Sequence, residues 1–142
     1  MNRLERAGIL RTETVGRTRL VHGNQGSPLY RPLAELVLKS FGPLQIVAEE
    51  FDQILKIDEI YVFGSWAARY LGEQGRNPGD VDVLVIGSPD RDAVYEAALR
   101  AERRLGVDVN PTIRSSDAWR GSRDGFIRQV KSSPLVRVDR DQ

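Results

Sequence analysis

Two short motifs carry the residue types that could do chemistry in this chain. Gly64-Ser65 follows an apolar run, and Asp80-Val81-Asp82 begins fifteen residues after Ser65. Alternate residues of a strand point to the same face, so Asp80 and Asp82 are expected to lie side by side. Two adjacent carboxylates repel each other, and Mg²⁺, which binds a few carboxylates together with substrate phosphates, would relieve that repulsion. The pair therefore predicts a metal site for phosphoryl transfer, in which two ions ~4 Å apart can clamp the attacking and leaving oxygens.

Gly64-Ser65 is expected at the junction between a strand and a short helix. The first N–H groups of a helix attract anions, glycine lets a phosphate approach the backbone, and serine can bond a phosphate oxygen. A Gly-Ser alone is more typical of a capped turn, and a lone Asp-x-Asp of a solvated strand start. Their joint occurrence at this spacing, between two apolar strands, predicts a nucleoside-triphosphate site.

Composition restricts the chemistry to carboxylates, hydroxyls and arginines. The 142 residues contain no cysteine and a single histidine, His22. This excludes disulfides, thiolate zinc sites, cysteine catalysis, histidine-based triads and multi-histidine metal sites. The length suits one domain, or one domain with a small appendage. The apolar runs are too interrupted to span a membrane and no signal peptide is visible, so we expect a cytoplasmic protein with no membrane partner.

Apolar periodicity predicts the elements that must position the two motifs. The expected elements are helices over residues 32–41 and 44–55, strands over 59–63, 81–86 and 107–114, and a long amphipathic helix after residue 90. Pro111 suggests that the last of these strands lies at an edge or carries a bulge. Mixed strands and helices, with the sheet beginning near residue 59, predict an α/β or α+β fold.

The run YVFGSWAARYLGEQGRNPGDVDVLVIG resembles the nucleotidyltransferase superfamily typified by DNA polymerase β, and most of all its small bacterial and archaeal "minimal" members. Their signature is a Gly-Ser, a nearby arginine and then Asp-x-Asp. The resemblance covers roughly residues 58–115. It implies a mixed sheet with flanking helices, and Mg²⁺-dependent transfer of a nucleotide from an NTP to an acceptor hydroxyl of a protein or nucleic acid. It also implies that such a chain can act as an antitoxin paired with a HEPN-type toxin.

The same resemblance implies roles for individual residues. Gly64 and Ser65 would hold the triphosphate, and Arg69 would contact a phosphate, although it stands one position later than the commonest family spacing. Asp80 and Asp82 would be the catalytic residues that bind two Mg²⁺ ions.

The family places a third acidic residue on the following strand, where it activates the acceptor hydroxyl. Asp108 and Asn110 share one face of the expected strand over 107–114. Asp108 is the predicted third catalytic and metal-binding carboxylate. If Asn110 occupies that position instead, its amide can neither take a proton nor bind Mg²⁺ as well, and transfer should be crippled.

The N-terminal segment resembles part of a winged-helix DNA-binding domain. Residues 1–40 contain seven Lys+Arg against three Asp+Glu, although the whole chain has a formal charge of only +1. The run LERAGILRTETVGRTRLVHGNQGSPLYRPL looks like the end of a recognition helix followed by a β-hairpin wing. Arg11, Arg17 and Arg19 would then contact DNA.

The sequence predicts two parts and leaves two functions open. A partial winged-helix segment is expected over residues 1–30, and a nucleotidyltransferase domain over 31–142, with helices in 32–56 and a catalytic core at about 58–115. The first function is nucleotidyl transfer, for which the acceptor, the preferred base and the oligomeric state stay open. The alternative is a transcriptional regulator whose nucleotidyltransferase-like domain senses nucleotides with little catalysis.

Overall fold

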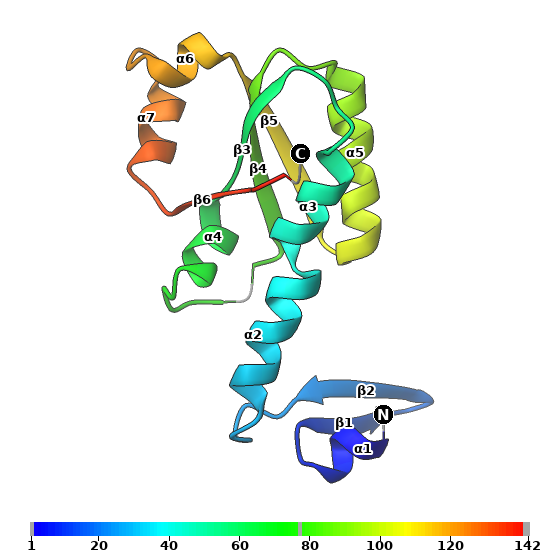
Figure 1. Cartoon of the computed structure of the whole chain (residues 1–142). Coiled ribbons are helices and arrows are strands. Elements are labelled where there is room, and N and C mark those ends of the chain that lie inside the picture. The colour runs from blue at the N-terminus through cyan, green and yellow to red at the C-terminus, as the bar shows by residue number, and fades with distance from the viewer. Residues whose placement is uncertain (1, 77, 141–142) are drawn as a thin grey trace. The chain divides into compact units, whose positions relative to one another are not determined.

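The computed structural model describes residues 2–76 and 78–140 and divides into two compact units, residues 1–41 and 42–142. The first unit contains α1 (Asn2–Arg6), β1 (Leu10–Val15), β2 (Thr18–Gly23) and α2 (Tyr30–Phe41) (Figure 1). Strands β1 and β2 form the expected antiparallel hairpin, which turns at Gly16 with φ +62°. Almost every side chain of the hairpin is exposed. The likeness to a winged helix and the predicted boundary after residue 30 stay predictions.

The second unit contains the elements that position the two motifs. They are α3 (Pro43–Phe51), β3 (Ile57–Phe63), α4 (Gly64–Tyr70), β4 (Asp80–Gly87), α5 (Arg91–Leu105), β5 (Asp108–Arg114), α6 (Ser116–Arg120), α7 (Gly125–Lys131) and β6 (Leu135–Arg137). The four strands form one sheet in the order β5-β4-β3-β6. Strands β4 and β5 run parallel, and β3 is antiparallel to both of its neighbours. The predicted mixed sheet with flanking helices is confirmed, and Pro111 lies in an edge strand as expected.

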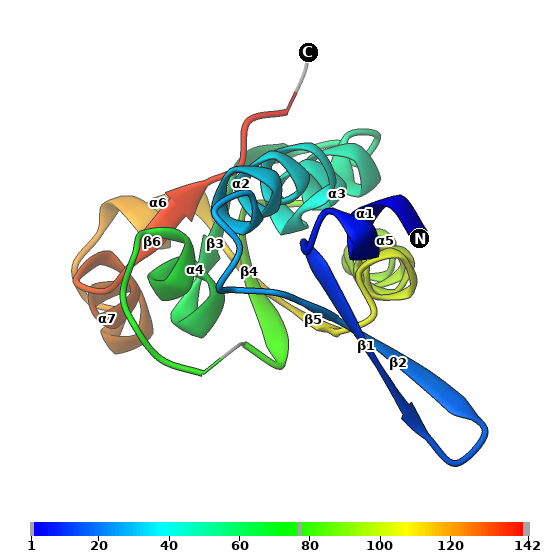
Figure 2. The same cartoon turned by 90° about the horizontal axis from the view of Figure 1, so that it is seen from below.

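The two faces of this sheet are covered by different helices (Figures 1 and 2). Val81, Val83 and Val85 of β4 are fully buried on the face that packs against α3 and α5. Leu84 and Ile86 are buried on the opposite face, where α6 and α7 supply aromatic and aliphatic partners. Strand alternation places Asp80 and Asp82 on this second face. The motif residues are therefore held by a strand that is anchored on both sides.

The helix expected over residues 44–55 is shorter than predicted, because α3 ends at Phe51. Ile54 donates its N–H to the Phe51 carbonyl in a turn, and Leu55 is 80% exposed rather than packed on a helix face. Lys56 then adopts φ +64°, and its carbonyl accepts the N–H of Ser88 after β4. Ile54 and Leu55 continue the apolar spacing of the helix in the sequence, but they lie in a turn. This turn brings the chain into register with the end of β4.

Candidate active site

Gly64 and Asp82 are brought together by the antiparallel pairing of β3 and β4. Phe63, the last residue of β3, is directly opposite Asp82, and Gly64 follows it with φ +72°. A Cβ atom added at Gly64 would lie 2.5 Å from Asp82 Oδ2. The backbone conformation therefore favours glycine at this position, and a side chain here would also have to displace the Asp82 carboxylate. The two motifs, separated by fifteen residues in the chain, meet at one end of the sheet.

Asp80 and Asp82 share the face of β4 that continues into Leu84. Both carboxylates are partly buried at the start of the strand. Burial raises the pKa of the Asp82 carboxyl above its ordinary value, the charge of Asp80 raises it further, and a hydrogen bond from Asn110 opposes both effects. Among the described residues, no ion pair reaches either carboxylate. The pair is thus a concentrated negative charge next to the bare backbone of Gly64.

Strand β5 brings Asn110, not Asp108, into contact with this pair. In the parallel register Asp80 is opposite Asp108, and Asp82 is opposite Asn110. The Asn110 Nδ2 group donates to Asp80 Oδ2 at 3.1 Å and to Asp82 Oδ1 at 3.3 Å. Within residues 2–76 and 78–140, no three His, Cys, Asp or Glu side chains are grouped closely enough to hold one metal ion. Of Asp108 and Asn110, the residue that contacts the two carboxylates is therefore Asn110.

Ser65 and Arg69 both lie on α4, directly after Gly64. Ser65 is exposed at the start of the helix. The Arg69 guanidinium donates from Nε to the Arg76 carbonyl and from Nη1 to the Glu73 carbonyl, both at 3.0 Å. Gly75 lies directly against this guanidinium, so that a side chain at Gly75 would have to displace it. Arg69 therefore holds the loop that leads to Asp80, a role that its sequence position did not indicate.

The arginines of the N-terminal hairpin belong to the first unit. Arg19 forms an ion pair with Glu5 of α1, and this hydrogen bond holds the pKa of the Glu5 carboxyl below its ordinary value. Arg11 is opposite His22 in the ladder, and Arg17 occupies the exposed turn. All three predicted DNA contacts are therefore exposed on the hairpin, and Arg19 is also paired with a neighbouring helix.

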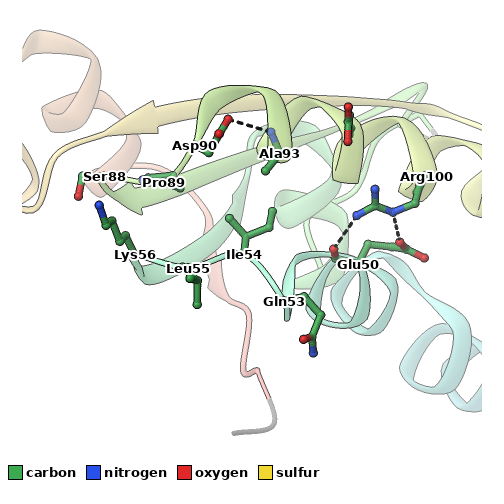
Figure 3. Close-up of a pocket in the computed structure, with 11 residues that line it drawn as sticks. Glu50, Gln53, Ile54, Leu55, Lys56, Ser88, Pro89, Asp90, Ala93 and Arg100 are labelled. Atoms are coloured by element: carbon green, nitrogen blue, oxygen red, sulfur yellow. Dashed lines mark hydrogen bonds and ion pairs between the residues drawn. The ribbon is translucent and has the colours of Figure 1, made fainter.

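A cavity of about 610 Å³ lies at the opposite end of the sheet from Asp80 and Asp82 (Figure 3). The loop after α3, the turn after β4 and the first turns of α5 line it. Three of its charged groups have internal partners: Arg100 Nε donates to Glu50 Oε2 at 2.8 Å, and Asp90 accepts the N–H groups of Asp92 and Ala93 as the cap of α5. The size of this cavity does not make it the site of chemistry, because it lacks both motifs.

Comparison with known proteins assigns the second unit to a family. The model of the nucleotidyltransferase domain matches residues 44–132, and the chain belongs to this family. Members use an NTP and divalent metal ions, and the match supports transferase activity in general. No curated protein matches. No helix within the described residues is long and apolar enough to cross a membrane.

Several solved structures contain chains similar to this one. One is a toxin–antitoxin with AMP-PNP, whose chain is 23% identical over 70% of this chain and 75% of its own, with a TM-score of 0.49. Another is the MntA-HpeT toxin–antitoxin carrying a double mutation, at 22% identity over 70% and 74%, with a TM-score of 0.48. A third is a Shewanella oneidensis tri-AMPylated HEPN toxin in complex with MNT antitoxin, at 21% identity over 70% and 74%, with a TM-score of 0.40.

Proposed function

We propose that this chain transfers a nucleotide from an NTP to an acceptor hydroxyl in a reaction that depends on Mg²⁺. The observation that carries the proposal is the meeting of the two motifs at Asp82. This carboxylate shares a strand face with Asp80 and lies against the bare backbone of Gly64. A pair of carboxylates beside a bare glycine backbone suits a cation and a phosphate chain bound together.

The residues present fit one Mg²⁺ shared with the substrate. Asp80 and Asp82 would hold the ion, since Mg²⁺ in proteins usually takes one or two carboxylates plus substrate phosphates. When bound, the ion would neutralise charge on the phosphates. Gly64 leaves room for those phosphates beside Asp82, and the hydroxyl of Ser65 is the proposed donor to a phosphate oxygen. The second ion predicted from the sequence would need Asp108, which is exposed and opposite Asp80.

Transfer forms one bond and breaks one. The acceptor oxygen bonds to the α-phosphorus, the bond from that phosphorus to the pyrophosphate oxygen breaks, and the hydroxyl proton must go to a base. Asn110 cannot take this proton, because an amide has no basic lone pair at neutral pH. We assign the role of base to Asp108. We infer that transfer is slow, because Asp108 lies opposite Asp80, two residues along β5 from the position opposite Asp82.

The proposed partner is a HEPN-type toxin that presents the acceptor hydroxyl, with this chain as its antitoxin. The support is the sequence resemblance over residues 58–115, together with membership of the nucleotidyltransferase family. Arg69 would have to release the loop carbonyls of Glu73 and Arg76 before it could contact a phosphate. We therefore propose that Arg69 contacts the triphosphate only after this loop has rearranged.

The test is transfer of label from each of the four α-³²P NTPs, with Mg²⁺, to a HEPN-type toxin or to the chain itself. We expect labelled protein and free pyrophosphate, and a loss of at least ~100-fold in rate for Asp80→Asn and for Asp82→Asn. Asp117→Asn is the matched control, because it changes an exposed carboxylate on α6 that forms an ion pair with Arg120. Absence of transfer with all four nucleotides and every acceptor would contradict the proposal.

Contact between Asn110 and the carboxylate pair favours a second candidate, a regulator that binds nucleotides without turnover. The exposed Arg11 and Arg17 of the hairpin would then contact duplex DNA. Binding should weaken steeply with salt, with a slope that falls by about 1 when Arg17 is changed to alanine. DNA binding that is undetectable or insensitive to salt would rule this candidate out.

A further inference from the structure

The Asn110 amide bridges Asp80 and Asp82, the two carboxylates that would hold the proposed cation. Its single Nδ2 group donates to one oxygen of each carboxylate, at 3.1 and 3.3 Å. The parallel pairing of β4 and β5 fixes this position, because Asn110 is directly opposite Asp82. The amide therefore offsets part of the repulsion between two carboxylates that have no ion-pair partner in the described part of the chain.

An asparagine side chain has a donor end and an acceptor end of similar shape. In the arrangement seen here the donor end faces the carboxylates. Rotation about the Cβ–Cγ bond would bring Oδ1 to the same place, where it could act as a neutral ligand to a cation. Asparagine can serve in this way, since a catalytic-loop asparagine holds Mg²⁺ in protein kinases.

We propose that Asn110 makes cation binding at Asp80 and Asp82 conditional on a triphosphate. Without nucleotide, the Asn110 NH₂ group bridges the carboxylates and a cation must displace two hydrogen bonds. With nucleotide, the phosphates supply the missing negative charge, and the amide turns to present Oδ1. This inference rests on the proposed function only for the identity of the ligands, an NTP and a divalent cation.

Charge is the physical reason for this dependence. Asp80, Asp82 and Asn110 offer two negative charges, whereas three carboxylates would offer three, and affinity for divalent cations rises with the charge of the ligand set. The exposed Asp108 does not complete the set, because no group of three carboxylates is found within the described residues. By reciprocity, the cation must raise triphosphate affinity by the same factor as the triphosphate raises cation affinity.

The test measures Mn²⁺ binding to the full chain by electron paramagnetic resonance, with Mn²⁺ alone and with inorganic tripolyphosphate present. Tripolyphosphate avoids any dependence on the preferred base. For the wild-type chain we expect tripolyphosphate to tighten Mn²⁺ binding at least ~10-fold. Asn110→Asp should tighten the binding of Mn²⁺ alone by ~10-fold or more, and should reduce the effect of tripolyphosphate.

The matched control is Gln129→Glu, which makes the same change from amide to carboxylate on the exposed side of α7. It should leave both affinities unchanged. A second readout is the side-chain NH₂ resonance of Asn110 in ¹⁵N-labelled protein. It should move when Mg²⁺ and tripolyphosphate are added together, and stay in place with Mg²⁺ alone.

Equal Mn²⁺ affinity with and without tripolyphosphate would overturn the inference, as would no binding under either condition or no gain for Asn110→Asp. Its failure can be distinguished from failure of the proposed function. A chain that transfers nucleotides but binds Mn²⁺ alone just as tightly refutes only the inference. A chain that binds Mn²⁺ with tripolyphosphate but never transfers a nucleotide refutes only the proposed function.

Discussion

Strand β4 carries two different halves on one face. Its first half presents Asp80 and Asp82, partly buried and contacted by an amide, whereas its second half presents Leu84 and Ile86, which are 0% and 1% exposed. Helices α6 and α7 cover only the apolar half. The covered half fixes the strand, so that the carboxylates of the open half can be held close together at a cost in stability.

The largest effect on stability should come from the covered half. Leu84→Ala should lower the free energy of unfolding by about 2–5 kcal/mol, because it removes a fully buried side chain from between β4 and α7. Urea denaturation would measure the loss. Leu55→Ala is the matched control: Leu55 is 80% exposed, and its truncation should change stability by less than about 0.5 kcal/mol. Similar losses of stability for Leu84→Ala and Leu55→Ala would show that the covered half of β4 does not anchor the strand.

The next effect should come from the open half, at Gly64. Gly64→Ala places a side chain at φ +72° and against Asp82 Oδ2, and should cost about 1–3 kcal/mol of stability. It should also weaken the binding of a non-hydrolysable NTP, since the added methyl group fills the space beside the carboxylate. Gly106→Ala separates the two causes, because Gly106 has the same φ of +72° with nothing within 4 Å of its added Cβ.

Unfolding curves and calorimetric nucleotide titrations of the two glycine variants supply the measurement. Both variants should lose stability from the backbone strain, and only Gly64→Ala should lose nucleotide affinity. Equal nucleotide binding by both would show that the close approach of Gly64 to Asp82 has no part in the site.

A smaller effect should arise in the loop before Asp80. Arg69→Ala removes two hydrogen bonds from a charged donor to the carbonyls of Glu73 and Arg76. Because the loop is exposed, we expect a local loss of about 1 kcal/mol, seen as ~5-fold faster amide hydrogen exchange over residues 73–76. Global stability should barely change. Unaltered exchange in this loop would indicate that Arg69 does not hold it.

The sequence predicted the elements with strong periodicity and the meeting of the two motifs. Strand alternation was enough to place Asp80 and Asp82 on one face, whereas Gly64 reaches the same end of the sheet because β3 and β4 pair antiparallel. The choice between Asp108 and Asn110 depended on the register of β4 and β5. Both residues lie on one face, so no local pattern could show which of them touches the carboxylates, and that contact depends on long-range pairing.

Two other features depended on contacts that the sequence does not encode locally. Ile54 and Leu55 continue the helical spacing of α3, yet the helix ends at Phe51 because the chain must turn to pair with the end of β4. Arg69 stands near the position of a family arginine, but its guanidinium binds the backbone of a loop four to seven residues later. Such outcomes are decided by which partner comes within reach once the sheet has formed.

The smallest effect concerns the pH dependence of stability at Asp82. Burial, with the charge of Asp80, raises the pKa of this carboxyl in the folded chain above its ordinary value. A raised folded-state pKa contributes stability that is fully present below the unfolded pKa and is lost as the pH rises through the folded pKa. At neutral pH the Asp82 charge therefore lowers stability, and Asp82→Asn should unfold at a higher temperature than the wild-type chain.

The difference in Tm between Asp82→Asn and the wild-type chain should shrink as the pH falls through the folded pKa of Asp82, because the protonated carboxyl and the amide are then alike in charge. Thermal unfolding from pH 7 down to pH ~3.5, just below the ordinary pKa of an aspartate, would measure this. Asp117→Asn is the control, since the Asp117 side chain is 95% exposed and is not buried as Asp82 is. If the gain in Tm from Asp82→Asn did not vary with pH, the gain would come from packing and not from removal of the buried charge in the open half of β4.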